Sequence, residues 1–346
     1  MPLFLSVVIR SKDEADRLRL TLVSLVGQSG DYEVIVVNDG SSDHTPEVLS
    51  EAKDILPLKV VTHCEAQGRS AASNAGARVA KGEILLFLDG DTLAGPGLLQ
   101  AHQNMHSRCE SAVGRGELFH LRCTRLLRDP HAGIPWETEA KKMALRSVTE
   151  LNKLQVTLQQ VRDDFGQISQ RAEPGIYPGL GPRKLNYLEN DALANTPDCQ
   201  SIWSTACGSN MSVRRDDFLA SGGYNLKIDI NEHRELALRL INRGAKMIRV
   251  LDAPTYHMTH RSGWRDPLKD LAWEHEFLKV HPIASVALLP VLWGSISTAT
   301  VLPNEYRITS LLELDQAAGK KDLLDYDVAR TALGLRPLGR AFWRNG

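Results

Sequence analysis

The chain has 346 residues, of which 42% are hydrophobic, 24% charged and 6% aromatic. This ordinary globular composition excludes disordered, collagen-like and disulfide-scaffold proteins. Lysine and arginine number 41 against 42 aspartates and glutamates, for a formal net charge of -1, so nucleic-acid binding driven by phosphate neutralisation is disfavoured. The five cysteines form no C-x-x-C pair, which is typical of free thiols in a reducing cytoplasm.

The first third of the chain alternates apolar strands with helices. Its start is apolar, has no basic stretch and runs directly into Arg10, which favours a strand over a signal peptide. Near-continuous apolar strands separated by helices predict a parallel sheet covered on both faces, with the ligand crevice at the carboxyl ends of the strands. We expect strands over 4–9, 33–37, 58–62 and 83–88, and helices over 12–28, from Thr45-Pro46 onward, and over 69–80.

The middle of the chain has a different composition. Residues 136–170 are rich in Lys, Glu, Gln and Leu, which predicts one or two amphipathic helices, whereas the Gly and Pro of 173–197 predict a loop. A structured insertion followed by such a loop commonly forms a lid or a recognition surface, with a mobile surface loop as the alternative. Beyond it we expect a strand and turn over 208–213, a helix over 232–243 and a strand over 246–251.

Residues 283–302 carry no charge and are long enough to span a bilayer. Pro290, Gly294 and several hydroxyl side chains dilute the hydropathy of this segment. We therefore expect a buried or interfacial helix pair, with peripheral membrane contact or a homodimer contact as alternatives. The expected location is the cytoplasm, with or without contact to a membrane surface.

Two carboxylates flank a glycine where a buried strand is predicted to end, in Phe87-Leu-Asp-Gly-Asp91. Aspartates at i and i+2 on a tight turn can direct their oxygens at one hard cation, and Mg²⁺ or Mn²⁺ prefers such ligands together with phosphate oxygens. A turn after a strand also carries Asp and Gly for conformational reasons alone. The position at the carboxyl end of a strand favours a metal site at Asp89 and Asp91.

A further carboxylate, Asp39, follows the second predicted strand. It is placed to accept a hydrogen bond from a nucleotide base, although a β-turn held by side-chain hydrogen bonds would use the same residue. The small-residue helix that begins at Arg69 could turn its N-terminus toward a diphosphate, while close packing alone would explain its alanines. His102 and His106, four apart on a predicted helix, are expected on a solvated face.

Short motifs follow one another along the chain in a fixed order. They are Val7-Val-Ile-Arg-Ser-Lys-Asp-Glu14, Asn38-Asp-Gly-Ser-Ser-Asp43, Asn74-x-Gly76, Gly82-Glu-Ile-Leu-Leu-Phe-Leu-Asp-Gly-Asp91, Cys207-Gly-Ser-Asn-Met-Ser-Val213, Gly222-Gly-Tyr224 and Glu232-His-Arg-Glu-Leu-Ala-Leu-Arg-Leu240. In order and approximate spacing they resemble family 2 glycosyltransferases of the GT-A fold, over residues 3–110 and 205–260. The third motif reads Ser73-Asn74 where the family usually has Arg-Asn. The Gln-x-x-Arg-Trp element of processive polysaccharide synthases is absent from the sequence, which favours addition of a single sugar.

The resemblance implies inverting, metal-dependent transfer of a sugar from a nucleotide-diphosphate donor, with a UDP-sugar favoured, to an acceptor hydroxyl. The acceptor stays open among small molecules, glycans, lipids, peptides and modified nucleic acid. By this analogy Asp39 contacts the base, Asp89 the ribose or the metal, and Asp91 the Mn²⁺ or Mg²⁺ ion that neutralises the leaving diphosphate. The expected donor-binding set also includes Ser11, Arg69 and Asn74.

Inversion needs a group that removes the proton of the acceptor hydroxyl as its oxygen attacks. The family usually places this base in a Glu-Asp pair at a helix start, and here the pair reads Glu232-His233. Glu232 is the favoured base, His233 is the alternative, and a carboxylate that only caps the helix is the structural interpretation. His257 and His260, after the last predicted strand, are expected as metal or diphosphate ligands.

The expected architecture is α/β: a GT-A type, Rossmann-like, mostly parallel sheet with helices on both faces, a helical insertion and a helical C-terminal region. We expect a glycosyltransferase domain over 1–265, comprising a donor half over 1–110, an acceptor-side insertion over 130–200 and an acceptor half over 205–265, followed by an extension over 266–346. Two other functions remain open. A sugar-phosphate nucleotidyltransferase would release pyrophosphate, and a non-catalytic protein that binds sugar nucleotides or glycans would bind the donor without turnover.

Overall fold

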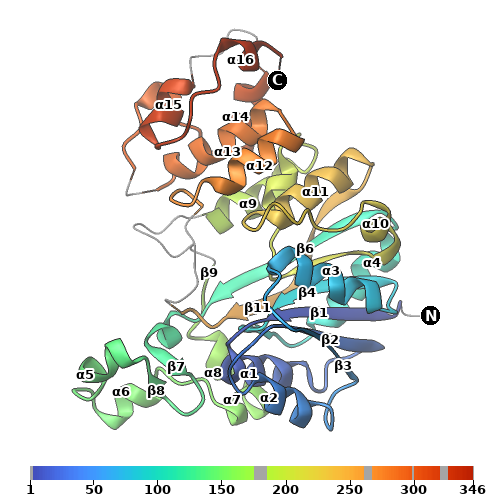
Figure 1. The fold of residues 1–346 in the computed structure, drawn as a ribbon, viewed down its shortest axis with the longest axis vertical. Coiled ribbons are helices and arrows are strands. Elements are labelled where there is room, and N and C mark those ends of the chain that lie inside the picture. Colours follow the sequence, from blue (N-terminus) through green and yellow to red (C-terminus); the bar gives the residue numbers. More distant parts are fainter. Residues whose placement is uncertain (1–2, 175–184, 261–266, 298–299, 320–325, 346) are drawn as a thin grey trace.

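The computed structural model describes residues 3–174, 185–260, 267–297, 300–319 and 326–345 (Figure 1). Within these ranges, nine strands form one sheet in the order β3-β2-β1-β4-β10-β6-β11-β5, with β9 paired to β6. Their bounds are β1 Leu5–Ser11, β2 Tyr32–Asp39, β3 Leu58–His63, β4 Ile84–Asp89, β5 Thr92–Ala94, β6 Ala112–His120, β9 Glu173–Pro174, β10 Met211–Arg214 and β11 Lys246–His257.

The sheet is mostly parallel, as predicted from the first third of the chain. β1 pairs in parallel with β2 and β4, and β2 pairs in parallel with β3. β10 runs antiparallel between β4 and β6, and β6 and β11 are again parallel. The edge strand β5 was not predicted; it is only three residues long and runs antiparallel to the end of β11.

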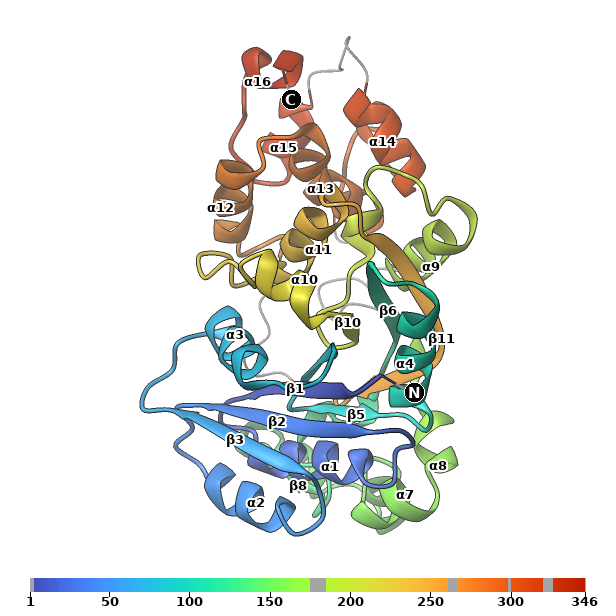
Figure 2. The ribbon, with the colours of Figure 1, turned by 90° about the vertical axis from the view of Figure 1, so that its right-hand side faces the viewer.

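Alternate residues of the central strands face opposite layers of helices, because successive side chains of a strand point to opposite faces. Val7 packs into a core with α1, α2 and α4, whereas Val8 packs into a core with α3, α11 and α13. Figure 2 shows α1 and α2 on one side of the sheet and α3, α10 and α11 on the other. These helices are α1 Ala15–Leu25, α2 Thr45–Ala52, α3 Arg69–Val79, α4 Leu98–Arg108, α10 Arg215–Ala220, α11 Glu232–Asn242 and α13 Ala284–Ser295.

The segment between β6 and β10 differs from its prediction. Residues 136–170 form short helices rather than one or two long ones, because Ser147 and Thr157 each make a capping box that starts a new helix. The predicted loop 173–197 contains the helix α9, and its residues 175–184 lie outside the described part of the chain. The elements are η1 Arg122–Leu126, β7 Leu127–Asp129, β8 Ile134–Pro135, η2 Glu137–Glu139, α5 Ala140–Met143, α6 Val148–Asn152, α7 Leu158–Asp163, α8 Gly166–Ser169, α9 Leu185–Asn195 and η3 Ile202–Thr205.

Within the uncharged segment 283–302, residues 284–295 form the single helix α13, where a helix pair was expected. Burial within the chain explains the apolar composition of this helix, because its side chains lie in the same core as α3 and α11. Trp293 of α13 packs on Trp273 with ring centroids 5.6 Å apart. No helix within the described ranges is long and apolar enough to cross a membrane. The other C-terminal elements are α12 Ala272–Val280, η4 Asn304–Tyr306, α14 Leu311–Gly319, α15 Asp327–Ala332 and α16 Arg340–Asn345.

The prediction that His102 and His106 lie on a solvated face is wrong. Both imidazoles are buried against β10, where His102 contacts Ser212 Oγ at 2.7 Å and Asn210 Oδ1 at 2.9 Å. His106 Nε2 lies 2.9 Å from the same Ser212 Oγ. The spacing of four residues aligns both histidines with Leu98 on the inner face of α4.

Acid should therefore destabilise this protein partly through His106. Burial lowers the pKa of His106 to about 3, so below an unfolded value of about 6.5 the unfolded chain takes up a proton that the folded chain does not. The contribution of His106 to the free energy of unfolding is therefore unaffected above pH 6.5 and becomes less favourable as the pH falls toward 3. From pH 7 to pH 5 we expect the free energy of unfolding to fall by about 2 kcal/mol less in His106→Gln than in the unaltered protein. Urea unfolding at the two pH values measures it, with exposed His275→Gln as the control, which should leave the pH dependence unchanged.

Candidate functional site

The candidate residues gather at the carboxyl ends of the parallel strands. Asp39 ends β2, Asp89 ends β4 and His257 ends β11. Glu232 is the first residue of α11 and lies beside Arg10 of β1. Because β1 lies between β2 and β4 in the sheet, residues from distant parts of the sequence meet at one sheet edge.

Asp91 lies at the centre of a three-residue group. Its Oδ2 is 3.1 Å from His257 Nε2 and 2.8 Å from His260 Nε2. One ligand atom from each of these residues lies within 4.8 Å of the others, and Asp91 is buried. A carboxylate oxygen and two imidazole nitrogens at these distances form a set that a divalent cation can join.

Charge holds this group in a defined protonation state. Burial alone would raise the pKa of Asp91, but His257 and His260 hold it well below its usual range. Burial would lower the pKa of His257, but the charge of Asp91 and the hydrogen bond to it raise that pKa. Asp91 is therefore an ionised carboxylate, the form that binds a metal, and His257 would release its proton when a metal binds.

His120 of β6 backs this group and was not predicted from the sequence. Its Nδ1 lies 3.2 Å from His257 Nδ1, and burial together with the charge of His257 lowers the pKa of His120 to about 3. His120 is therefore neutral and contacts the ring nitrogen of His257 that faces away from Asp91. No strand was predicted over β6, whose sequence includes Arg115 and Glu117, so His120 had no clear signal in the sequence.

Glu14 adds a further carboxylate to this edge. Burial and the nearby charge of Asp91 raise the pKa of Glu14 well above its usual range, and Asp89 adds to the effect. Burial and repulsion of this kind favour the uncharged form of the Glu14 carboxyl. A cation bound near Asp91 and Asp89 would reduce the repulsion.

Arg10 links Asp89 to Glu232. Its Nε donates to Asp89 Oδ1 at 2.7 Å and its Nη1 donates to Glu232 Oε1 at 2.6 Å. Burial would lower the pKa of Arg10, but the two carboxylates raise it. Asp89 does not belong to the three-residue group around Asp91, so its role as a ribose or metal ligand remains a prediction. Sequence reasoning missed Arg10, although a charged residue at the end of an apolar strand is a detectable signal.

Asp39 organises the loop that follows β3. Its Oδ1 accepts from Gln67 N at 2.9 Å and contacts His63 Nδ1 at 2.7 Å, and its Oδ2 accepts from Gly68 N at 2.9 Å. Gly68 has a φ of 92°, a left-handed conformation that favours glycine. Asp39 thus shapes the N-terminus of α3, and its contact with a nucleotide base remains a prediction.

The other predicted donor ligands differ in their surroundings. Ser11 is buried at the end of β1, and its Oγ has no hydrogen-bond partner among the described residues. Arg69 is exposed at the start of α3. Asn74 is buried, where its Nδ2 donates to Tyr224 O at 2.9 Å and its Oδ1 accepts from Tyr224 N at 2.8 Å. Both ends of the Asn74 amide therefore hold the turn before α11, and all three donor-binding roles remain predictions.

Glu232 is 2% exposed and ionised. Burial would raise its pKa, but Arg10 and His233 hold that pKa well below the usual range. Its Oε1 is bonded to Arg10, whereas its Oε2 faces His233 Nδ1 at 3.7 Å. Glu232 is therefore deprotonated, which a general base must be before it takes a proton, and its ion pair with Arg10 makes it a weaker base than a free glutamate.

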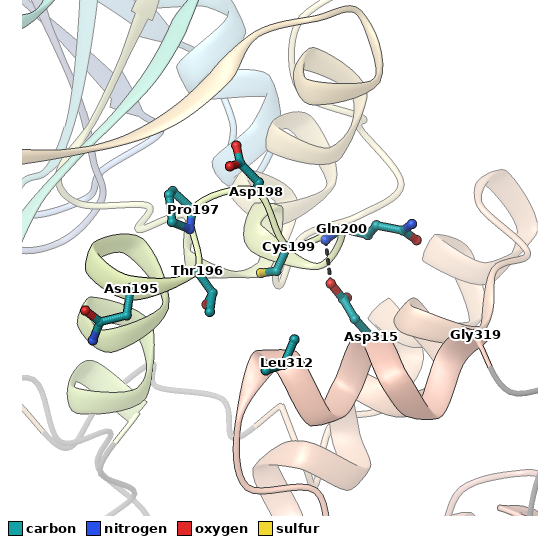
Figure 3. A pocket seen from close by; sticks show the side chains of 9 residues that line it. All are labelled: Asn195, Thr196, Pro197, Asp198, Cys199, Gln200, Leu312, Asp315 and Gly319. Atoms are coloured by element: carbon teal, nitrogen blue, oxygen red, sulfur yellow. Dashed lines mark hydrogen bonds between the residues drawn. The ribbon is translucent and has the colours of Figure 1, made fainter.

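A separate pocket of about 420 Å³ lies away from this edge. Figure 3 shows it between the loop that follows α9 and the helix α14. The carboxylate of Asp315 accepts there from the backbone of Gln200 and from Ser201 N at 2.8 Å. Asp315 thus joins α14 to the loop, and none of the predicted site residues lines this pocket.

The first third of the chain is similar in sequence to known glycosyltransferases. Residues 6–118 match the family model described as "Glycosyl transferase family 2". Validoxylamine A glucosyltransferase from Streptomyces hygroscopicus subsp. jinggangensis is 40% identical over 107 residues, which cover 30% of this chain and 25% of that protein. Glycosyltransferase AglE from Haloferax volcanii is 37% identical over 92 residues, which cover 25% of this chain and 30% of that protein. The chain thus spans under a third of the length of either relative.

Solved structures share the fold over more of the chain. S. aureus TarS 1-349 is similar with a TM-score of 0.51 and 15% identity, over 84% of this chain and 68% of that one. The same fragment in complex with UDP-GlcNAc gives a TM-score of 0.53 and 16% identity, over 84% and 70%. At these identities the likeness shows the fold, which is the GT-A type that the sequence motifs predicted.

Proposed function

We propose, from the membership of residues 6–118 in glycosyl transferase family 2, that this glycosyltransferase moves a single sugar from a nucleotide-diphosphate sugar to an acceptor hydroxyl with inversion. The observation that carries the proposal is the placement of the Asp91, His257 and His260 group next to the Arg10 and Glu232 pair at one sheet edge. The first could hold the metal of the donor complex, and the second could activate the acceptor.

A UDP-sugar is the favoured donor. The structural neighbour S. aureus TarS 1-349 is described in complexes with UDP and with UDP-GlcNAc, and its fold resembles this chain over most of its length. Asp39 at the end of β2 would contact the base, after exchanging part of its contact with His63. Ser11, with its unpartnered buried Oγ, and Arg69 would face the rest of the donor.

The donor set fits a divalent metal. Asp91 would hold the ion through its carboxylate, and His257 and His260 would hold it through their Nε2 atoms. Two imidazoles beside a carboxylate favour Mn²⁺ over Mg²⁺, which prefers an all-oxygen set. When bound, such an ion supplies Lewis-acid stabilisation of the leaving diphosphate. The repulsion of Glu14 by Asp91 and Asp89, which a cation would reduce, supports the same fit.

Glu232 would serve as the general base. Arg10 occupies its Oε1, so the acceptor hydroxyl would give its proton to Oε2. Arg10 also binds Asp89, and this single side chain therefore fixes the distance between the donor-side carboxylate and the base. Proximity of this kind is where much of the rate enhancement of a transfer reaction arises.

The acceptor half is proposed to include the insertion over 130–200 together with 205–265, beside a donor half over 1–110. The acceptor itself is a small molecule, a glycan, a lipid, a peptide or a modified nucleic acid. The free cysteines support a cytoplasmic location as a proposal.

A thermal-shift screen of nucleotide diphosphates and their sugar conjugates, with and without Mn²⁺, tests the donor assignment. A ligand that binds only the folded state raises the apparent stability by mass action, so we expect the largest rise with a UDP-sugar and Mn²⁺ together. UDP release with an acceptor panel then tests transfer. Pyrophosphate release from a nucleoside triphosphate and a sugar phosphate, or donor binding without turnover across the panel, would each contradict the proposed reaction.

A further inference from the structure

We infer that His233 is locked as the neutral tautomer with its proton on Nδ1, and that it positions the Glu232 carboxylate instead of acting as a base. The tautomer follows from the contacts of the ring alone, whereas the positioning role rests on the proposed function. The sequence could not separate Glu232 from His233 as the base, and the surroundings of the imidazole separate them.

The proton on His233 is fixed by Arg234. Arg234 Nη1 lies 2.9 Å from His233 Nε2, and a guanidinium has donors but no acceptor. Nε2 must therefore accept this hydrogen bond through its lone pair, which leaves the ring proton on Nδ1. A second proton on the ring would require breaking this bond and placing a positive charge against Arg234. Burial and this arginine indeed lower the pKa of His233, with Glu232 acting in the opposite direction.

Arg234 cannot turn away, because its guanidinium is held on several sides. Its Nε donates to Ser204 O at 2.7 Å, its Nη1 also donates to Asn231 Oδ1 at 2.8 Å, and its Nη2 donates to Glu189 Oε1 at 3.0 Å. The guanidinium carbon lies 5.2 Å from the ring centroid of Trp293, in cation–π range. The uncharged helix α13 therefore contributes an aromatic support to this arginine.

Glu189 of α9 connects Arg234 to a second buried arginine. Its Oε2 accepts from Arg115 Nη2 at 2.7 Å, and Arg115 also donates to Asn186 Oδ1 at 3.1 Å and to Thr205 O at 3.1 Å. Arg115, Glu189 and Arg234 are all buried. A fully hydrogen-bonded buried chain of this kind is rigid, since breaking any member leaves an uncompensated charge.

The remaining N–H of His233 faces the candidate base. Nδ1 has no hydrogen-bond partner in the described part of the chain, and its nearest carboxylate oxygen is Glu232 Oε2 at 3.7 Å. Arg10 already holds Oε1 of the same carboxylate. A shift of under an ångström would let Nδ1–H donate to Oε2, which would fix the carboxylate plane from both sides and leave a lone pair of Oε2 for the acceptor hydroxyl.

The lack of a side chain at Gly208 leaves room for the imidazole in this position. A Cβ added to Gly208 would lie 3.0 Å from His233 Nδ1, which is tighter than an ordinary contact. The Cys207-Gly208-Ser209 turn therefore lies against the imidazole near Nδ1. This gives a packing reason for glycine at a position whose backbone conformation does not demand it.

The tautomer is testable without any activity. In full-length protein labelled with ¹⁵N-histidine, a two-bond ¹H–¹⁵N correlation at pH 7 distinguishes protonated from unprotonated ring nitrogens, with assignment by loss of signals in His→Asn variants. We expect His233 to show a protonated Nδ1 and an unprotonated Nε2. His102 is the internal reference for the opposite tautomer, because Asn210 Nδ2 donates to Ala253 O and so turns Oδ1 toward His102 Nε2. A protonated Nε2 on His233, alone or with Nδ1, would overturn the inference and leave the proposed reaction untouched.

The positioning role is tested by a matched pair of variants. His233→Asn keeps an N–H donor near the place of Nδ1 and cannot serve as a base, whereas His233→Leu removes the donor. We expect kcat to stay within about tenfold of the original in the asparagine variant and to fall about 100-fold in the leucine variant, with the donor KM unchanged in both. An equal loss of 100-fold or more in both variants would assign proton transfer to the imidazole and contradict a positioning role. If the leucine variant does not fold, the rescue by asparagine and the ¹⁵N spectrum still decide the question.

Discussion

Asp91→Asn is expected to abolish Mn²⁺ binding and to lower sugar transfer by about 1,000-fold or more. The amide keeps the shape of the side chain, and its oxygen can still accept from His257 and His260, which contact Asp91 at 3.1 Å and 2.8 Å. What is lost is the only carboxylate in the three-residue group. Calorimetry of Mn²⁺ with UDP, followed by a UDP-release assay, measures both effects.

The matched control for this variant is Asp252→Asn. Asp252 is exposed in the irregular part of β11 and has a φ of 56°, a conformation that asparagine adopts readily. It should leave metal binding and turnover unchanged. Normal turnover of the Asp91→Asn protein at a limiting Mn²⁺ concentration would mean that the metal of the donor complex, if one is used, is held elsewhere.

Glu232→Gln is the second variant with a large expected effect. Removal of a general base costs about 10² to 10⁴ in kcat, and glutamine keeps the volume of the side chain and can still accept from Arg10 at its amide oxygen. Donor binding should be retained, because Arg10 keeps its 2.7 Å bond to Asp89. Single-turnover kinetics with a separate titration of UDP and Mn²⁺ distinguishes the chemical step from binding.

Glu110→Gln serves as the control for this second change, because Glu110 is exposed and lies near Arg214, at the opposite end of β10 and β4 from the site. Its turnover should equal that of the unaltered protein. If Glu232→Gln kept a kcat within a few-fold of the original, the base would have to be another group, and the role of Glu232 would be structural.

The sequence predicted the first third of the fold well because its signals are local. Runs such as Val34 to Val37 are buried on both faces of a parallel sheet, and that burial shows directly in composition. The prediction for the insertion over 136–170 was wrong for the opposite reason. Its Leu and Lys content suggested long helices, but single hydroxyl residues such as Ser147 and Thr157 determine where each short helix begins. A capping box can be recognised in a sequence, but the sequence does not show whether it will interrupt a long amphipathic helix.

The candidate site was predictable where it follows strand ends and hidden where it depends on tertiary contacts. Asp91, His257 and His260 all come at or after predicted strands, and the structure brings them together. Arg10 lies near a strand end and was overlooked, whereas Glu189 carries no such signal, because its importance comes from partners more than 40 residues away. Asn74 shows the reverse problem, since its position in a motif suggested a ligand and its amide is occupied by Tyr224.

The uncharged stretch over 283–302 illustrates how one pattern serves two structures. A run of this length without charge suits a bilayer or a buried core helix equally. In this chain α13 packs into the main core, with Leu288 and Leu289 fully buried. Trp293 of this helix contacts Arg234. This contact connects the C-terminal region to the residues around the candidate base.

The most direct measurement is a crystal structure of the chain grown with UDP and Mn²⁺, with anomalous scattering recorded at the manganese edge. We predict one peak bonded to Asp91 Oδ2 and to Nε2 of His257 and His260, in contact with the diphosphate of the nucleotide. A nucleotide bound at the sheet edge with no manganese peak beside Asp91, or a peak held by other residues, would contradict the account.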